Sequence, residues 1–261
     1  MFNFFWKKKN NNSEDENKPV EYKENFTNIS PVVEYFKNET GVSFEKQISI
    51  LQNKVINFCR RNKIYSYNQL LQVIQTDENI KQDLINTLTT NETFFYREFK
   101  QIQELVELVK KTDGDIKILC APSSTGEEPF SIAIALLEAG VSAQRFTITG
   151  VDINSDAIKK ALKASYGERN VRNLSHDVIN RYFNKVGDNY NLKDEVKSLV
   201  RFETANIFDE SFKSIGKFDF VFSRNMLIYF DKETKQKAKT ILESIRKYDT
   251  HDVFFGHADL F

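Results

Sequence analysis

The feature that most constrains the fold is a set of short apolar segments that alternate with helical patterns in the second half of the chain. Four of these segments have the length of a buried strand: IKILCA, FTITGVDI, FDFVFS and DVFFG. Amphipathic patterns that predict helices lie between them. Because strands that are apolar throughout need cover on both faces, the alternation indicates a parallel sheet between layers of helices. We expect an α/β fold with a doubly wound, mostly parallel sheet.

Helical patterns alone precede this sheet. The segment SFEKQISILQNKVINFCRRN places its apolar residues on one face at helical spacing: Phe44, Ile48, Leu51, Val55, Ile56 and Cys59. Two further helical patterns follow it, each opening with a Ser or Thr cap, and Ser30-Pro31 is typical of a helix start, with Ser30 as the cap. We predict a small all-helical domain over residues 29–92, followed by the α/β domain over 93–261.

The first 28 residues lack the apolar content that a folded core needs. An aromatic and basic tip, MFNFFWKKK, is followed by the polar run NNNSEDENK, so we predict a disordered tail over residues 1–28. The tip has the composition of a weak membrane-interface anchor, although we prefer to interpret it as an unused terminus. No apolar run approaches the roughly 20 residues that cross a bilayer. We therefore expect a cytoplasmic protein that contacts a membrane at most through this tip.

Charge and cysteine content exclude several classes of function. Lys plus Arg equals Asp plus Glu at 37 each, so the chain has no net field that would attract nucleic acid. Its two cysteines, Cys59 and Cys120, lie far apart without companions at ligand spacing. We therefore expect no nucleic-acid partner, no disulfide framework and no metal site.

Acidic residues follow the first two predicted strands, at the edge where parallel sheets bind ligands. The turn SSTGEE after IKILCA is neither a dinucleotide glycine fingerprint nor a phosphate loop, and Glu127 and Glu128 would repel a pyrophosphate. They suit a cationic nucleoside such as S-adenosylmethionine, although favourable placement at a helix N-terminus also explains them. Asp152 could accept hydrogen bonds from ribose hydroxyls; its alternative role as a helix cap falls more naturally to Asn154 or Ser155.

Two other segments carry polar side chains in apolar surroundings. After FDFVFS come Arg224, Asn225 and, close behind, Tyr229, which either have partners in a site or form a helix cap with a packed Tyr. Arg97 falls near the start of a predicted helix, where a cation opposes the helix dipole. We infer that another contact holds it there, while the three aromatics before it could be ordinary core.

Four stretches in this order resemble the CheR family of chemotaxis-receptor methyltransferases: NETFFYRE, SSTGEEPFSIA, DINSDAIKKALKASY and FDFVFSRNMLIYFDKETKQ. GHADLF is a weaker fifth match, and the similarity runs from about residue 30 onward. As an ordered set the motifs are specific to the family. The resemblance implies an enzyme that transfers a methyl group from S-adenosylmethionine to glutamate side chains of bacterial chemoreceptors, forming methyl esters for adaptation in chemotaxis.

The resemblance also implies roles for individual residues. Contacts with the cofactor would come from the first motif, from the acids at the methionine and ribose ends, and from pairs near the adenine and along the pocket: Asn91, Thr93, Arg97, Glu128, Asp152, Asn206, Ile207, Asn225 and Met226. Arg97 and Tyr229 resemble the side chains that position the reacting carboxylate. Because a glutamate with a pKa of about 4.3 is already ionised, no general base is needed, and we assign His257 a structural role.

The partners implied are the cytoplasmic signalling helices of chemoreceptors, at whose arrays a monomeric enzyme would be recruited. In the family the N-terminal helices dock on acidic receptor helices; Arg60, Arg61 and Lys63 could do this here, or could be a solvated helix end. Some members grip a receptor's C-terminal peptide with an antiparallel insert. The corresponding insert near 184–200 looks short, which argues against that contact.

Two other functions remain open at this point. The first is a methyltransferase that acts on another substrate; the missing Asn/Asp-Pro-Pro-aromatic motif after FDFVFS argues against a nucleobase. The second is a non-catalytic module that binds cofactor or receptor, against which the presence of both Arg97 and Tyr229 argues weakly. The missing glycine fingerprint disfavours a nicotinamide oxidoreductase.

Overall fold

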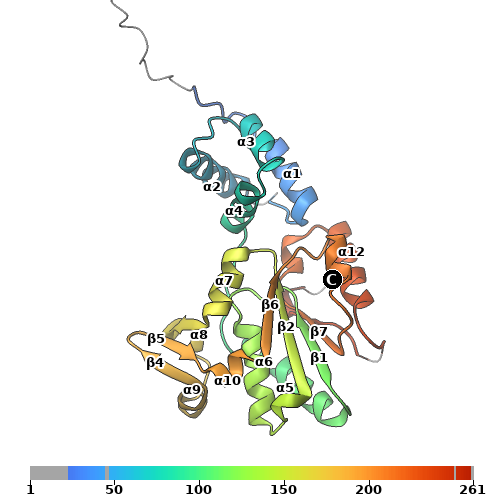
Figure 1. Ribbon diagram of the computed structural model, residues 1–261. Coiled ribbons are helices and arrows are strands. Elements are labelled where there is room, and N and C mark those ends of the chain that lie inside the picture. The colour runs from blue at the N-terminus through green and yellow to red at the C-terminus, as the bar shows by residue number, and fades with distance from the viewer. Residues whose placement is uncertain (1–22, 45–46, 250, 260–261) are drawn as a thin grey trace, which may run out of the picture.

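The computed structural model describes residues 23–44, 47–249 and 251–259, in a helical part that sits on an α/β part (Figure 1). The aromatic tip and most of the predicted tail lie outside these residues. The end of that tail contacts the helices, since the backbone N–H of Asn25 donates to the carbonyl of Tyr65 at 2.8 Å and the guanidinium of Arg60 binds Glu24 at 2.8 Å. The tail boundary predicted at residue 28 therefore lies too far along the chain.

The N-terminal part consists of helices, as its patterns predict: α1 (Ser30–Thr40), α2 (Ile48–Arg61), α3 (Tyr67–Ile74) and α4 (Glu78–Leu88). They enclose an apolar core of their own that includes Leu51, Val55 and Phe58. Ile48, the first residue of α2, which we placed on the buried face, is 45% exposed, so that part of the prediction was wrong.

Two of the three predicted helix caps are wrong. Ser66 caps α3 as expected, accepting from the backbone N–H of Gln69 at 3.1 Å. For α4, Asp77 is the cap, because its carboxylate accepts from the backbone N–H groups of Asn79 and Ile80. Helix α1 begins at Ser30 itself, and Ile29 precedes it without a side-chain cap. Sequence alone did not distinguish between neighbouring polar residues at these helix starts.

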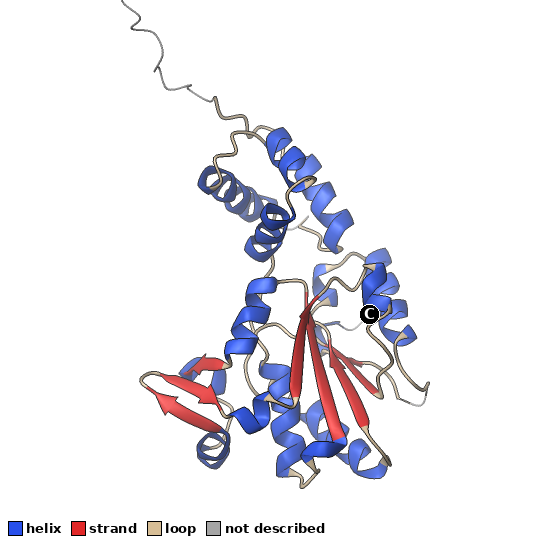
Figure 2. Cartoon of the chain, viewed as in Figure 1, coloured by secondary structure: helices blue, strands red, loops and turns tan. Residues whose placement is uncertain are grey.

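The α/β part contains a five-stranded sheet in the order β6-β2-β1-β7-β8, with every pair parallel (Figure 2). The strands are β1 (Ile116–Cys120), β2 (Phe146–Asp152), β6 (Val200–Thr204), β7 (Phe220–Ser223) and β8 (Phe254–Phe255). This confirms the predicted fold class. Of these five strands only β6 escaped prediction, because it is an edge strand with mostly exposed residues and no continuous apolar run.

Helices cover both faces of the sheet, and alternate residues of β1 enter two different cores. Ile118 and Cys120 pack in the core that α5 and α6 cover, whereas Leu119 packs with residues of α12. The helices of this part are α5 (Phe99–Lys111), α6 (Glu127–Glu138), α7 (Ser155–Lys163), α8 (Glu168–Val171), α9 (His176–Tyr182), α10 (Asp194–Lys197), α11 (Glu210–Lys213) and α12 (Lys232–Ser244). Short 3-10 turns are η1 (Ala143–Arg145), η2 (Leu227–Tyr229) and η3 (His257–Asp259).

A second, antiparallel sheet projects from the α/β part, in the order β3-β5-β4 (Figure 2). Its strands are β3 (Ser165–Gly167), β4 (Phe183–Val186) and β5 (Asn189–Leu192). The insert that we expected to be short near 184–200 thus begins earlier, because the end of the predicted helix SDAIKKALKASY leaves the helix at Ala164 and supplies β3. The predicted bounds of 184–200 therefore begin too late, since β3 and the start of β4 precede them.

Polar contacts fix the helical part on the carboxyl edge of the main sheet. The amide of Gln82 on α4 donates to the carbonyl of Ile153 at 2.9 Å, and Asn86 exchanges two hydrogen bonds with Ser155 at the start of α7. The backbone N–H of Ser43 donates to the carbonyl of Tyr229 at 2.8 Å. Parallel sheets bind ligands at the carboxyl ends of their strands, and here α1, α2 and α4 lie over those ends. Within the described ranges no helix is long and apolar enough to cross a membrane.

Candidate active site

A cavity of about 890 Å³ lies between the helical part and the carboxyl ends of the strands. Ten of the residues that the sequence nominated for a site line it: Asn91, Thr93, Arg97, Glu128, Asp152, Asn206, Ile207, Asn225, Met226 and Tyr229. They come from five separate segments of the chain, which the parallel sheet brings to one edge. Convergence around one cavity does not by itself assign a role to each side chain.

Asp152 is the last residue of β2 and is buried at 5% exposure. Its two carboxylate oxygens accept from the backbone N–H groups of Ser124 and Asn154, each at 2.8 Å. Burial raises the pKa of the Asp152 carboxyl to about 6, although these two hydrogen bonds oppose the rise. The alternative capping role belongs to Asn154, whose side chain accepts from the N–H of Ala157. Asp152 is left to face the cavity.

The two glutamates at the start of α6 point in different directions. Glu127 is fully buried away from the cavity, where its oxygens accept from Thr125 at 2.6 Å and from Asn170 at 2.7 Å. Glu128 lines the cavity, and its Oε2 binds the guanidinium of Arg224. Oε1 of Glu128 is buried without a hydrogen-bond partner among the described residues. Only one of the two acids can therefore meet a ligand.

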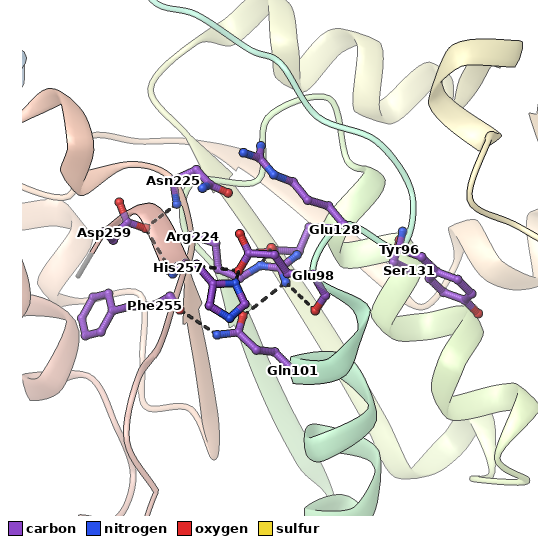
Figure 3. Close-up of polar contacts among 12 residues, drawn as sticks. Tyr96, Glu98, Gln101, Glu128, Ser131, Arg224, Asn225, Phe255, His257 and Asp259 are labelled. Atoms are coloured by element: carbon purple, nitrogen blue, oxygen red, sulfur yellow. Dashed lines mark hydrogen bonds and ion pairs between the residues drawn. The ribbon is translucent and has the colours of Figure 1, made fainter.

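Arg224 is the group that sequence analysis noted without finding its partner. It is 5% exposed and also donates to the carbonyl of Glu98 at 3.4 Å and to Oε1 of Gln101 at 3.3 Å (Figure 3). Burial raises the pKa of the Glu128 carboxyl, and the adjacent guanidinium opposes that rise. Because the pair is buried and bonded, it presents one free acidic oxygen at a fixed position, which fits the ammonium group of S-adenosylmethionine.

The loop after β7 is held by a residue that sequence reasoning missed, Asp259. This carboxylate is fully buried and accepts from the backbone N–H groups of Asn225, Ile228 and Gly256, the last two at 3.2 Å (Figure 3). Asn225 has a left-handed backbone with φ of 61°, which these contacts stabilise. The weak GHADLF match was the only available signal for it. Asp259 thus shapes the wall that carries Asn225 and Met226.

Arg97 precedes α5 instead of occupying its first turn, so the dipole argument does not apply to it. Its neighbours Tyr96 and Glu98 both have left-handed backbones, with φ of 57° and 47°. Its guanidinium donates to the carbonyl of Glu92 at 3.1 Å and lies 5.8 Å from the ring centroid of Phe94. These contacts are the ones expected to hold it, and they leave the side chain beside the cavity.

Tyr229 and His257 differ in exposure and partners. Tyr229, in η2, is 39% exposed and lines the mouth of the cavity. His257 lies on the other side of the Arg224 network, with Nδ1 at 3.0 Å from Oε2 of Glu98 (Figure 3). His257 does not line the cavity. These positions suit a substrate contact for Tyr229 and the structural role expected for His257.

Asn206 connects the cavity to the helical part. Its amide donates to the carbonyl of Glu39 at 2.7 Å, while its Oδ1 accepts from the N–H of Phe208 at 3.1 Å. Ile207 is buried beside it at 6% exposure. In the part of the chain that the structure describes, no group of three or more His, Cys, Asp or Glu could hold a metal ion.

Comparisons with known proteins agree with this site. The family model described as "CheR methyltransferase, SAM binding domain" matches residues 91–261. The chain is 32% identical to the chemotaxis protein methyltransferase of Campylobacter jejuni, over 89% of this chain and 88% of that protein. It is 32% identical to chemotaxis protein methyltransferase 2 of Vibrio cholerae (87% and 83%) and 31% identical to the chemotaxis protein methyltransferase of Salmonella typhimurium (81% and 76%).

These matches cover both the cavity and the helical part that roofs it. The buried, unpartnered oxygen of Glu128 and the carboxylate of Asp152 provide the acidic groups that a cationic nucleoside requires. The chain belongs to the CheR family of S-adenosylmethionine-dependent methyltransferases.

Proposed function

We propose that this enzyme methylates glutamate side chains on the cytoplasmic signalling helices of bacterial chemoreceptors, and that the methyl esters serve adaptation in chemotaxis. The observation that carries the proposal is the unpartnered Oε1 of Glu128 in the same cavity as Arg97. One group suits a cationic methyl donor and the other suits an anionic acceptor. The names of the relatives supply the chemotactic context.

The buried wall of the cavity would hold the cofactor. Glu128 would bind the ammonium at its methionine end, and Asp152 the ribose hydroxyls. The remaining contacts would come from the other nominated residues around the cavity: Asn91, Thr93, Asn206, Ile207, Asn225 and Met226. When bound, S-adenosylmethionine supplies an electrophilic methyl group on a sulfonium.

The mouth of the cavity would hold the acceptor carboxylate. A guanidinium binds a carboxylate through parallel hydrogen bonds, so Arg97 can fix its orientation. Tyr229 can donate one further hydrogen bond. Since the glutamate is already ionised, these residues need only to align it and to limit its contact with water. Phe44 and Leu51 of the helical part line the same cavity and exclude water there.

The helical part is also the proposed docking surface for acidic receptor helices, with the enzyme acting as a monomer recruited to receptor arrays. Arg61 and Lys63 are exposed at the end of α2, whereas Arg60 is paired with Glu24. Lys54 extends the basic character of α2 to the cavity itself. A surface of this charge would attract an acidic helix.

The test is to incubate the enzyme with methyl-labelled cofactor and the cytoplasmic fragment of a chemoreceptor encoded by the same genome. We expect label on the receptor that mild alkali releases, because esters hydrolyse and N-methyl groups do not. Label that resists alkali would indicate a methyltransferase of another substrate. Cofactor binding without any transfer to receptor fragments would indicate a regulatory module.

A further inference from the structure

The ring of Phe94, which lines the active-site cavity, has two guanidinium groups near it. Cζ of Arg172 is 3.7 Å from the ring centroid, and Cζ of Arg97 is 5.8 Å from it. Because both distances end at one point, the two carbons are no farther apart than the sum of these distances. Arg97, the proposed ligand of the methylated carboxylate, therefore has a second cation nearby.

A second cavity of about 450 Å³ places Arg172 beside the reaction site. It is lined by residues 90–94 and by Arg169, Asn170 and Arg172. The same segment, residues 90–94, lines the main cavity. The loop of residues 90–94 thus lies between the two cavities, and Phe94 lines both.

Hydrogen bonds join the chain segment next to Arg172 to the segment next to Arg97. The backbone N–H of Phe95 donates to the carbonyl of Asn170 at 2.9 Å, and the Asn170 amide donates to buried Glu127 at 2.7 Å. These bonds tie the end of α8 to the segment that precedes Arg97. This connection keeps the backbone segments that carry Arg97 and Arg172 next to each other.

Arg172 also has a free charge. The nearest acidic residue of the lining, Glu92, is paired with Arg169 at 2.9 Å. Among the described residues no carboxylate lies within 4.0 Å of Arg172, whose side chain donates only to the carbonyl of Arg169. An aromatic face orients a guanidinium and leaves its edge available for hydrogen bonds. The guanidinium of Arg172 is therefore able to bind an anion.

We propose that Arg172, held on Phe94, binds a second carboxylate of the receptor segment, so that the enzyme recognises a pair of acidic side chains. This inference rests on the proposed function. Acidic residues three or four positions apart on a helix have Cβ atoms about 5–6 Å apart, and their flexible side chains can reach two guanidinium groups spaced as Arg97 and Arg172 are. The first carboxylate is methylated, and the second sets which glutamate enters.

The test is a double-mutant cycle on a receptor fragment whose methylated glutamates have been mapped by mass spectrometry. Each acidic residue three or four positions from a methylated one is changed to Gln, and kcat/KM is measured with the unaltered enzyme and with Arg172→Ala. We expect Arg172→Ala to lower kcat/KM about tenfold on the unaltered fragment and to cause almost no further loss where the second acid is gone. Arg181→Ala, at an exposed arginine of α9 paired with Glu138, is the matched control and should match the unaltered enzyme.

The competing explanation is that Arg172 only supports the ring of Phe94. Arg172→Ala would then lower turnover equally on every fragment, and that result overturns the proposal, as does full activity on the unaltered fragment. A changed dissociation constant for S-adenosylhomocysteine would also overturn it, because it would show that the loss arises in the cofactor pocket. If the unaltered enzyme forms no alkali-labile ester on any receptor fragment, the proposed function itself fails and this inference fails with it.

Discussion

The two sides of the main cavity are built in different ways. On the sheet side Glu128, Asp152, Arg224 and Asp259 are buried and bonded to neighbouring groups. At the mouth Tyr229 is 39% exposed and Ile50 of α2 is 55% exposed. A small cofactor that is always the same can be met by a rigid, buried site, whereas a protein substrate must enter and leave. We therefore expect changes on the sheet side to affect affinity and stability, and changes at the mouth to affect turnover.

The largest effect is expected from Arg97→Ala, which tests the mouth. Without the guanidinium the acceptor carboxylate loses its orientation, so kcat should fall by roughly 1,000-fold, while the affinity for S-adenosylhomocysteine is retained or only weakened. Label transfer gives kcat, and calorimetry gives the affinity. Lys100→Ala, an exposed cation in the first turn of α5, is the control. Turnover near that of the unaltered enzyme would contradict the role of Arg97.

Glu128→Gln tests the sheet side. The substitution removes the charge that the ammonium requires and leaves buried Arg224 without its counter-ion. The dissociation constant of S-adenosylhomocysteine should rise by about 100-fold, and the free energy of unfolding should fall by about 3 kcal/mol.

The matched control for this change is Glu127→Gln, at the adjacent glutamate. Glu127 does not line the cavity, and its two oxygens are already bonded to Thr125 and Asn170, so the substitution removes no group that a ligand could meet. Calorimetry should show at most a few-fold change in affinity for this variant. Equal losses in both variants would mean that the start of α6 supports the cofactor only through its fold.

Asp259→Asn tests both sides of the cavity at once, because Asp259 is buried on the sheet side and holds the loop that leads to Tyr229 at the mouth. An amide in its place brings N–H groups toward backbone N–H donors, which leaves one or more of them without an acceptor. Each such loss costs about 1–3 kcal/mol. We expect kcat to fall by about 20-fold and the melting temperature to drop by several degrees. A lower melting temperature with normal kcat would show that Asp259 supports the fold alone.

The sequence was sufficient to predict which strands and residues form the site, but not the hydrogen bonds and ion pairs among those residues. Strands β1, β2 and β7 are mostly apolar and buried, so their ends could be located, and the parallel topology brought ten nominated residues to one cavity. The partner of Arg224 and the role of Asp259 were not predictable, since each depends on which distant group the fold places beside a lone charge. Strand β6 was missed because an exposed edge strand lacks the apolar run by which buried strands are found.

The smallest expected effect is a pH dependence that only the sheet side should show. Burial raises the pKa of Asp152 to about 6, from 3.8 in an unfolded chain. The ionised form, which is the one that the proposed contact with the ribose hydroxyls requires, therefore dominates above pH 6 and is lost below it. The affinity for S-adenosylhomocysteine should fall by about fivefold when the pH is lowered from 6 to 5, because about half of the carboxyl is ionised at its pKa and only about a tenth is ionised one pH unit below it. Calorimetry over this range with Asp152→Asn, which should bind weakly at every pH, separates this carboxyl from other groups. The pKa of Asp152 is higher in the folded protein than in the unfolded chain, so protonation of this carboxyl between pH 6 and 5 stabilises the fold. Unfolding that Asp152 caused would therefore decrease over this range, and it cannot be the reason for a loss of affinity.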